Sequence, residues 1–183
     1  MQLLVVRVEN IKNKIRTVPN WPKEGIMFRD ITTLLQDAEG LKDVVGEFVK
    51  RYMDKNIDIV AGIEARGFIL GGAVAKDLGV GFVPIRKKGK LPFKTLEETY
   101  EKEYGPDTIT MHIDAIKQGQ NILLIDDLLA TGGTALAAAK LIKKAGGKVA
   151  ECAFIVDLPD IGGRTKLEDA GYNVFTMVEF EGD

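Results

Sequence analysis

Short apolar runs recur along the chain, with aliphatic or aromatic side chains at most positions. They occupy residues 57–63, 81–86, 121–126, 148–158 and 173–180. A strand with one face in water alternates apolar and polar residues, whereas a strand covered on both faces reads as a continuous apolar run. We therefore expect these runs to form strands that are buried on both faces of a sheet.

Stretches with helical spacing lie between most of these runs, at residues 41–53, 67–79 and 134–146. The last of them ends in lysines followed by Gly146 and Gly147, which is typical of a helix C-terminus. Alternating strands and helices predict an α/β fold, with a parallel β-sheet flanked by helices. The chain has 183 residues, 45% of them hydrophobic, which fits a single domain with one core.

One segment interrupts this alternation. Residues 84–115, PIRKKGKLPFKTLEETYEKEYGPDTITMHIDA, combine prolines, glycine and dense charge. Long loops in compact domains are usually either functional or disordered. We expect this segment to be a long excursion from the sheet.

Composition narrows the class of partner. The chain has 25 Lys and Arg against 27 Asp and Glu, a formal net charge of −2. This balance argues against a protein that binds nucleic acid or a membrane surface through bulk positive charge, so we expect a small-molecule partner. The single cysteine, Cys152, lies in an apolar run and has no intrachain partner, which suits a reducing compartment. The first residues resemble neither a signal peptide nor a membrane span, and we expect a cytoplasmic protein.

Residues 121–134, NILLIDDLLATGGT, carry the most specific chemistry. Asp126 and Asp127 end an apolar strand, at the edge of an open α/β sheet where ligands bind. Gly132 and Gly133 let backbone N–H groups approach an anion, and the helix expected from Thr134 adds the positive end of its dipole. Two acids beside a phosphate-binding turn are suited to the paired hydroxyls of a ribose. We therefore predict a site for a ribose 5-phosphate group.

Competing motifs fit the chain less well. An acidic strand end with Thr131 capping a helix would account for the acids alone, but not for their combination with the glycine turn. The chain contains no G-x-x-x-x-G-K-[ST] motif. GVGFVP at residues 79–84 has too few glycines for a dinucleotide fingerprint and leads into a strand instead of a helix.

The stretch ILLIDDLLATGGT (122–134) resembles the phosphoribosyl pyrophosphate (PRPP) binding motif of the type I phosphoribosyltransferases. Further stretches resemble the adenine-specific members of that family over nearly the whole chain. They are WPKEGIMFRDIT (21–32), GIEARGFILGG (62–72), VPIRKKGKLP (83–92) and ETYEKEYG (98–105). The resemblance implies the type I phosphoribosyltransferase fold and the Mg²⁺-dependent reaction of adenine with PRPP to give AMP and pyrophosphate, a step of purine salvage.

The resemblance also implies a role for each matched segment. Residues 1–35 would form a base-binding hood segment, and residues 93–108 a flexible catalytic loop that carries Glu103. The residues implied for PRPP and AMP binding are Asp126, Asp127, Ala130, Thr131, Gly132, Gly133 and Thr134. Those implied for pyrophosphate binding are Glu64, Ala65, Arg66, Arg86, Lys87, Lys90 and Tyr104, with a cis peptide bond expected between Glu64 and Ala65. Those implied for adenine binding are Met27, Phe28, Arg29 and Leu158.

The implied mechanism is a dissociative displacement at ribose C1, with the acid pair holding the ribose hydroxyls. Mg²⁺ would be held mainly through PRPP, with no direct protein ligand. Glu103 would either transfer the purine proton or only position the base; the sequence leaves both roles open. Relatives form dimers in which residues matching Arg86, Lys87 and Lys90 reach the neighbouring subunit's pyrophosphate, so a homodimer is expected.

Several of these residues could instead have a purely structural role. Arg66 could lie in a surface turn, and the basic run from residue 86 to 90 could be a solvated loop. Phe28 follows two aliphatic residues and could belong to the core. His112, the only histidine, alternates with apolar neighbours and has no second ligand nearby, so we interpret it as structural.

Two other functions remain open from the sequence. The first is a phosphoribosyltransferase for another base, such as hypoxanthine, xanthine or orotate, against which the GIMFRD and EYG stretches argue. The second is a regulator that senses PRPP without catalysis. Such a repressor would need a DNA-binding extension, and the residues before Trp21 offer one short amphipathic helix.

Overall fold

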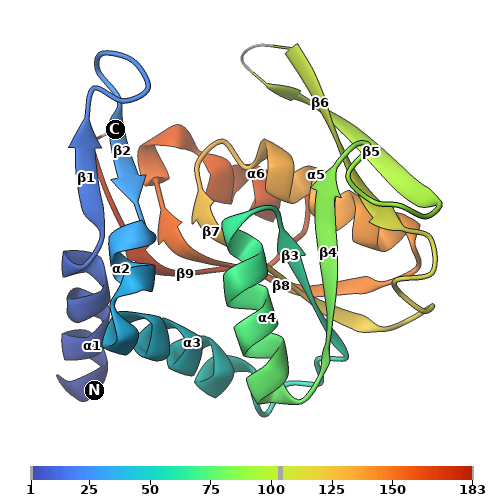
Figure 1. The fold of residues 1–183 in the computed structure, drawn as a ribbon, viewed down its shortest axis with the longest axis horizontal. Helices are drawn as coiled ribbons and strands as arrows, with labels where there is room; N and C mark the ends of the chain where they lie inside the picture. Colours follow the sequence, from blue (N-terminus) through green and yellow to red (C-terminus); the bar gives the residue numbers. More distant parts are fainter. Residues whose placement is uncertain (1, 103–104, 183) are drawn as a thin grey trace.

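The computed structural model describes residues 2–102 and 105–182 as a mostly parallel sheet with helices on both faces (Figure 1). The strands are Arg16–Pro19 (β1), Met27–Asp30 (β2), Ile59–Ile63 (β3), Gly81–Lys87 (β4), Thr95–Lys102 (β5), Gly105–His112 (β6), Asn121–Leu129 (β7), Lys148–Asp157 (β8) and Val174–Glu179 (β9). The helices are Gln2–Asn13 (α1), Thr32–Gln36 (α2), Ala38–Tyr52 (α3), Arg66–Leu78 (α4), Gly133–Lys144 (α5) and Gly163–Asp169 (α6), with a 3₁₀ turn at Pro159–Ile161 (η1).

The main sheet has the strand order β5-β6-β4-β3-β7-β8-β9. Strands β4, β3, β7, β8 and β9 are parallel, whereas β6 pairs antiparallel with both β4 and β5. The predicted parallel α/β sheet is therefore confirmed, with an antiparallel hairpin added at one edge. Strand β7 is the middle one of the five parallel strands, between β3 and β8, so its end is surrounded by neighbouring strand ends.

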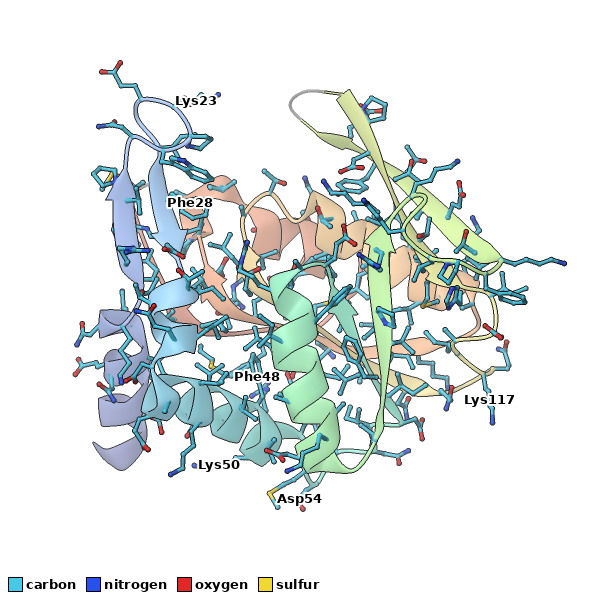
Figure 2. The ribbon with its side chains drawn as sticks, viewed as in Figure 1. Lys23, Phe28, Phe48, Lys50, Asp54 and Lys117 are labelled. Carbon is cyan, nitrogen blue, oxygen red and sulfur yellow. The ribbon has the colours of Figure 1, made fainter. Side chains whose placement is uncertain are left out.

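Both faces of β7 are buried, which explains its continuous apolar sequence. Leu123 and Ile125 pack in the core cluster that includes residues of α3 and α4. Ile122 and Leu124 point to the opposite face and pack in the cluster that includes α5. Phe48 points from α3 toward the sheet and has no exposed surface (Figure 2). Successive side chains of a strand alternate between faces, so a strand between two helical layers must be apolar throughout.

A partly buried ion pair joins α3 to the sheet. The Glu151 carboxylate on β8 accepts hydrogen bonds from Arg51 Nε and Nη2, both at 2.8 Å, and from the Tyr52 hydroxyl at 2.6 Å. Burial alone would raise the pKa of Glu151, but these hydrogen bonds outweigh it and lower the pKa to about 2. The carboxylate therefore stays ionised and fixes the start of β8 against the helix.

Two antiparallel hairpins extend from the same side of the molecule, on either side of the β7–α5 connection (Figure 1). The β1–β2 hairpin lies next to the C-terminal segment, where the Arg29 guanidinium stacks on the Phe180 ring at 4.5 Å. The β5–β6 hairpin lies along α5, and Lys144 Nζ donates to the Glu97 carbonyl over 2.9 Å. These hairpins bracket the ends of the central strands.

The structure differs from the sequence prediction in two places. The segment expected to be an excursion from the sheet contains the regular β5–β6 hairpin; β5 is rich in charge, and only the end of β6 is apolar and buried, at Ile109 and Met111. Strand β7 does not end at Asp126, because its pairing with β8 continues to Leu129. No helix of the described ranges has the length and apolar composition needed to cross a membrane.

Candidate active site

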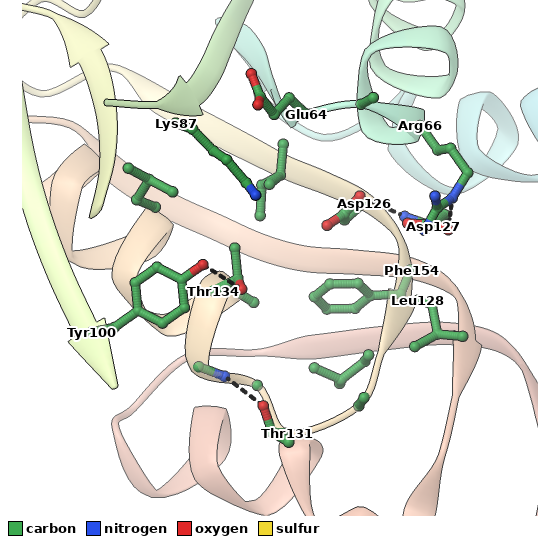
Figure 3. Close-up of a pocket in the computed structure, with 18 residues that line it drawn as sticks. Glu64, Arg66, Lys87, Tyr100, Asp126, Asp127, Leu128, Thr131, Thr134 and Phe154 are labelled. Atoms are coloured by element: carbon green, nitrogen blue, oxygen red, sulfur yellow. Dashed lines mark hydrogen bonds and ion pairs between the residues drawn. The ribbon is translucent and has the colours of Figure 1, made fainter. Parts of the chain in front are cut away.

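The C-terminal ends of β3, β4 and β7 surround a cavity of about 250 Å³. Its walls come from the β3–α4 connection, the end of β4, strand β5 and the β7–α5 connection (Figure 3). Open α/β sheets bind ligands at this edge. The predicted site residues that line the cavity are Glu64, Ala65, Arg66, Lys87, Asp126, Asp127, Ala130, Thr131, Gly132, Gly133 and Thr134.

The acidic pair lies at the floor of this cavity. The Asp127 side chain is 7% exposed, and its Oδ2 accepts a hydrogen bond from Arg66 Nε over 2.5 Å. Asp126 is half-buried and its Oδ1 accepts the Asp127 N–H over 2.9 Å. Burial and then the adjacent Asp127 carboxylate raise the pKa of Asp126 well above its usual value. The two carboxylates therefore differ in their electrostatic environment, since only Asp127 has a cation as its direct hydrogen-bond partner.

The start of α4 brings Arg66 to the acids. A Cβ atom on Gly67 would lie 2.9 Å from the Ile125 carbonyl oxygen, so only glycine lets the first turn of α4 approach β7 this closely. Partial burial lowers the pKa of Arg66, but the Asp127 carboxylate outweighs this effect and raises it overall. The peptide bond between Glu64 and Ala65 is cis, as expected. The β3–α4 connection thus places a permanent cation at the cavity wall.

The β7–α5 connection forms a tight turn over residues 130–134. Gly132 has a φ of +71°, a left-handed conformation that favours glycine, and α5 begins at the next residue. The first N–H groups of a helix have no acceptor within the helix, and the helix dipole is positive at this end. Because the side chains of this turn are small, an anion can approach its backbone directly. The turn has the properties of a phosphate site.

Two side chains from the neighbouring strands complete the cavity. The Thr134 hydroxyl donates a hydrogen bond to the Tyr100 hydroxyl over 2.9 Å, which fastens β5 to the start of α5. Figure 3 shows the Lys87 amino group pointing from β4 into the cavity, toward the space between Tyr100 and Asp126. Lys87 therefore faces the cavity of its own chain in this structure, and its expected reach to a second subunit stays a prediction.

A second hollow of about 340 Å³ lies beside β2 and shares Arg66 with the first. Its walls include Phe28 and Trp21, whose ring centroids are 4.4 Å apart in an edge-to-face arrangement. Trp21 is 51% exposed, so a flat ligand would find an aromatic wall open to solvent. Hydrogen bonds from the Thr32 hydroxyl and from Arg16 lower the pKa of Asp30, also in this wall, to about 2.

Of the other predicted residues, Arg29 lines the second hollow, and the rest of those described lie outside both walls. Arg86 Nε donates to Glu64 Oε2 over 2.8 Å, so these two predicted pyrophosphate ligands contact each other. Lys90 is exposed. Met27 is half-buried on β2 and Leu158 is buried, and neither lines the hollow beside Phe28.

Two predicted residues cannot be placed. Glu103, the predicted catalytic residue, and Tyr104, a predicted pyrophosphate ligand, both lie outside the described residues. Their roles stay predictions from the sequence.

Three aromatic residues at these walls had no role assigned from the sequence. Tyr100 belongs to the charged segment, where an aromatic residue beside the phosphate turn cannot be recognised without the hairpin. Phe154 lies in the apolar run of β8, which predicts only burial, yet it lines the cavity (Figure 3). Trp21 is the first residue of the matched stretch WPKEGIMFRDIT, but the sequence assigned no role to its ring, which lines the second hollow.

The arrangement suits an extended anionic ligand. One phosphate fits the glycine turn, two hydroxyls fit the acid pair, a second anionic group fits Arg66 and Lys87, and a flat ring fits the wall of Trp21 and Phe28. Within residues 2–102 and 105–182, no group of three or more His, Cys, Asp or Glu side chains could hold a metal ion. The side chains described thus provide binding and orientation for a phosphorylated sugar with a base.

Comparison with known proteins agrees with this geometry. The sequence model of the phosphoribosyl transferase domain matches residues 31–182. An adenine phosphoribosyltransferase of Prosthecochloris aestuarii is 59% identical over 175 residues, which cover 94% of this chain and 99% of the relative. The crystal structure of adenine phosphoribosyltransferase from Rhodothermus marinus is 48% identical, covers 96% of this chain and 99% of its own, and superimposes with a TM-score of 0.90.

A further solved structure carries ligands. Adenine phosphoribosyltransferase from Saccharomyces cerevisiae, complexed with an imino-altritol bisphosphate and adenine, is 35% identical with a TM-score of 0.89; the match covers 95% of this chain and 99% of the yeast chain. The similarity extends over the strand ends that form the cavity as well as over the helical layers. The chain belongs to the phosphoribosyltransferase family and, within it, to the adenine phosphoribosyltransferases.

Proposed function

We propose that this protein transfers the phosphoribosyl group of PRPP to adenine, forming AMP and releasing pyrophosphate in purine salvage. The observation that carries the proposal is the juxtaposition of the acid pair and the glycine turn at the end of β7, with Arg66 beside them. A ribose 5-phosphate needs an anion site and a diol site a few ångströms apart, and residues 126–134 supply both from one continuous segment.

The PRPP molecule would lie along this edge of the sheet. Its 5-phosphate would bind the backbone of residues 130–134, and its ribose hydroxyls would bind Asp126 and Asp127. Its diphosphate would bind near Arg66 and Lys87, whose positive charges face the same cavity. In this arrangement ribose C1 would lie between the diphosphate and the second hollow, from which the base attacks.

Adenine would bind in the hollow of Phe28 and Trp21, with backbone groups of β2 reading its edge. Aromatic walls favour a planar purine, and a polar edge is recognised by fixed hydrogen-bonding groups. The yeast relative was solved with adenine bound. In this proposal residues 1–35 would form the base-binding hood segment, and residues 93–108 the catalytic loop with Glu103.

We also propose Mg²⁺ as the cofactor, bound mainly through the substrate. The described residues provide no cage of carboxylates, and Mg²⁺ in phosphate-transfer sites typically binds substrate phosphates with one or two carboxylates. Glu64, Asp126 and Asp127 are the carboxylates on the cavity wall that could approach it. When bound with PRPP, the ion would neutralise charge on the leaving pyrophosphate.

The protein groups would act on the sugar and the base. As positive charge develops at ribose C1, the fixed acid pair would stabilise it while holding the hydroxyls in place. Adenine would attack C1 through N9, and Glu103 would receive the purine proton or position the ring. No covalent enzyme intermediate is required, because adenine N9 bonds to ribose C1 directly as the bond from C1 to the pyrophosphate oxygen breaks.

The base specificity is tested by pyrophosphate release with PRPP and Mg²⁺. Adenine should give a kcat/KM at least ~10²-fold above that of guanine, hypoxanthine or orotate, because a mismatched base leaves buried polar groups unpaired. Comparable rates with hypoxanthine or orotate would reassign the protein to another base. Absence of turnover with every base would instead support a PRPP-sensing regulator.

Asp126→Asn should have opposite effects on stability and activity. The folded-state pKa of Asp126 is raised, so its ionised form destabilises the fold above the unfolded pKa of about 4, and this cost disappears at lower pH. Urea unfolding should show the variant more stable than the parent by about 1 kcal/mol at pH 8, with the difference fading toward pH 4. Loss of charge beside ribose C1 should lower kcat about 10²-fold.

The matched control is Asp169→Asn, at an exposed carboxylate on α6 far along the chain from the cavity. It should change neither the unfolding free energy nor kcat. A lower stability of Asp126→Asn at pH 8 would contradict the assigned cost of the buried charge.

Glu103→Gln tests proton transfer, because glutamine retains the shape and a carbonyl oxygen of glutamate. If Glu103 receives the purine proton in the transition state, kcat and kcat/KM should fall together by roughly 10²–10⁴-fold. Glu101→Gln, two residues away and exposed on β5, is the control and should resemble the parent. A kcat within about threefold of the parent, with only the KM for adenine raised, would assign Glu103 to positioning alone.

We further propose a cytoplasmic homodimer. In the basic segment of residues 86–90, Lys87 lines the cavity and Lys90 is exposed, so in the proposed dimer Lys90 would be the residue that extends toward the neighbouring subunit. Cys152 is buried and unpaired, which suits a reducing cytoplasm. Sedimentation velocity at assay concentrations should give a dimer with full activity. A monomer that turns over at the same rate would contradict the proposed shared site.

A further inference from the structure

Two glycines from distant parts of the chain are in direct backbone contact behind the phosphate turn. A Cβ atom on Gly163 would lie 2.2 Å from the Ala130 carbonyl oxygen and 2.9 Å from the Gly132 nitrogen. A Cβ atom on Gly132 would lie 2.8 Å from the Gly163 carbonyl oxygen. Because the contacting atoms are backbone, no side chain can rotate away to make room. The start of α6 is therefore the direct support of the turn.

This support is itself fixed to the sheet. Gly163 is buried at the first position of α6, and the next residue, Arg164, anchors the helix. Arg164 Nε donates to Asp157 Oδ2 over 2.8 Å, and its Nη2 donates to the Thr176 hydroxyl over 2.5 Å. Asp157 is fully buried at the end of β8. The turn thus rests on a helix start that is held by β8 and β9.

The same connection carries a predicted base ligand. The segment from β8 to α6 begins with Leu158, whose N–H donates to the Leu129 carbonyl over 3.0 Å at the end of β7. The phosphate turn and the Leu158 segment therefore touch at two points, once through Leu129 and once through Gly163. Both of these contacts between the phosphate turn and the Leu158 segment are made by backbone atoms.

We propose that Gly163 is a positioning residue for the 5-phosphate. Because it has no side chain, α6 packs directly against the turn and holds the turn's N–H groups where they can donate to the phosphate. This inference rests on the proposed function, which places the phosphate on residues 130–134. A methyl group at position 163 must move the turn, because 2.2 Å and 2.9 Å are below any real Cβ contact distance. Displacing the turn's N–H groups by about 1 Å would weaken their hydrogen bonds to the bound phosphate considerably.

The decisive measurement compares two ligands that differ only in the phosphate. AMP and adenosine share base and ribose, so the ratio of the adenosine Kd to the AMP Kd isolates the contribution of the turn. In Gly163→Ala this ratio should fall roughly tenfold or more, which corresponds to loss of one charge-assisted hydrogen bond. The Kd of adenosine should stay close to that of the parent. Isothermal titration calorimetry gives both constants.

Gly162→Ala is the matched control. Gly162 has a φ of +82°, so alanine is strained there, but a Cβ atom at this position would meet nothing within 4 Å. Both variants should lose some stability, and only Gly163→Ala should lose the preference for AMP. Steady-state kinetics should show the same division, with the KM for PRPP raised in Gly163→Ala and the KM for adenine unchanged. A purely structural role would leave the ligand ratio unmoved.

The outcomes separate this inference from the proposed function. If the parent itself binds AMP no better than adenosine, the phosphate site and the proposed function are wrong. If the parent prefers AMP and folded Gly163→Ala keeps the parent's ratio, only the role of Gly163 is overturned.

Arg164→Lys takes the place of Gly163→Ala should the latter not fold. Lysine keeps a charge opposite Asp157 but loses the fork that also reaches Thr176, so the helix start is loosened. In Arg164→Lys the ratio of the adenosine Kd to the AMP Kd should fall by about threefold or more. A ratio equal to the parent's overturns the role of α6.

Discussion

The ion pair of Asp127 and Arg66 is the interaction on which the candidate site depends. A carboxylate at the end of a central strand is buried between two helical layers, and an unpaired charge there would be strongly destabilising. Arg66 provides the compensating charge from the first turn of α4, and it remains half-exposed toward the cavity. The pair thus stabilises the strand end and leaves a cation where an anionic substrate group can bind.

Close backbone approach is the second constraint. Gly67 lets α4 contact β7 beside Asp126, and Gly163 lets α6 contact the phosphate turn. In both places a helix start crowds against a strand end, and a side chain would separate them. The binding groups are then largely backbone N–H groups on rigid elements, which suits a phosphate because the geometry is fixed before the ligand arrives.

The two hairpins give the site its upper walls. The β1–β2 hairpin carries Phe28, and the stacking of Arg29 on Phe180 ties that hairpin to the C-terminal segment. The β5–β6 hairpin contributes Tyr100, which is hydrogen-bonded to the first turn of α5. Each wall is thus anchored to an element of the main sheet or its helices. Figure 1 shows the two hairpins on opposite sides of the β7–α5 connection.

The sequence by itself determined the central strands, the long helices and the segment from Asp126 to Thr134, because periodicity and a contiguous motif are local properties of the chain. It did not determine the β5–β6 hairpin, because β5 is charged and only the end of β6 has an apolar pattern, or the extension of β7 to Leu129. Only the tertiary structure decided that Tyr100, Trp21 and Gly163 adjoin the site. Their positions depend on contacts between segments far apart in sequence, and such contacts leave no periodic trace in the residues that make them.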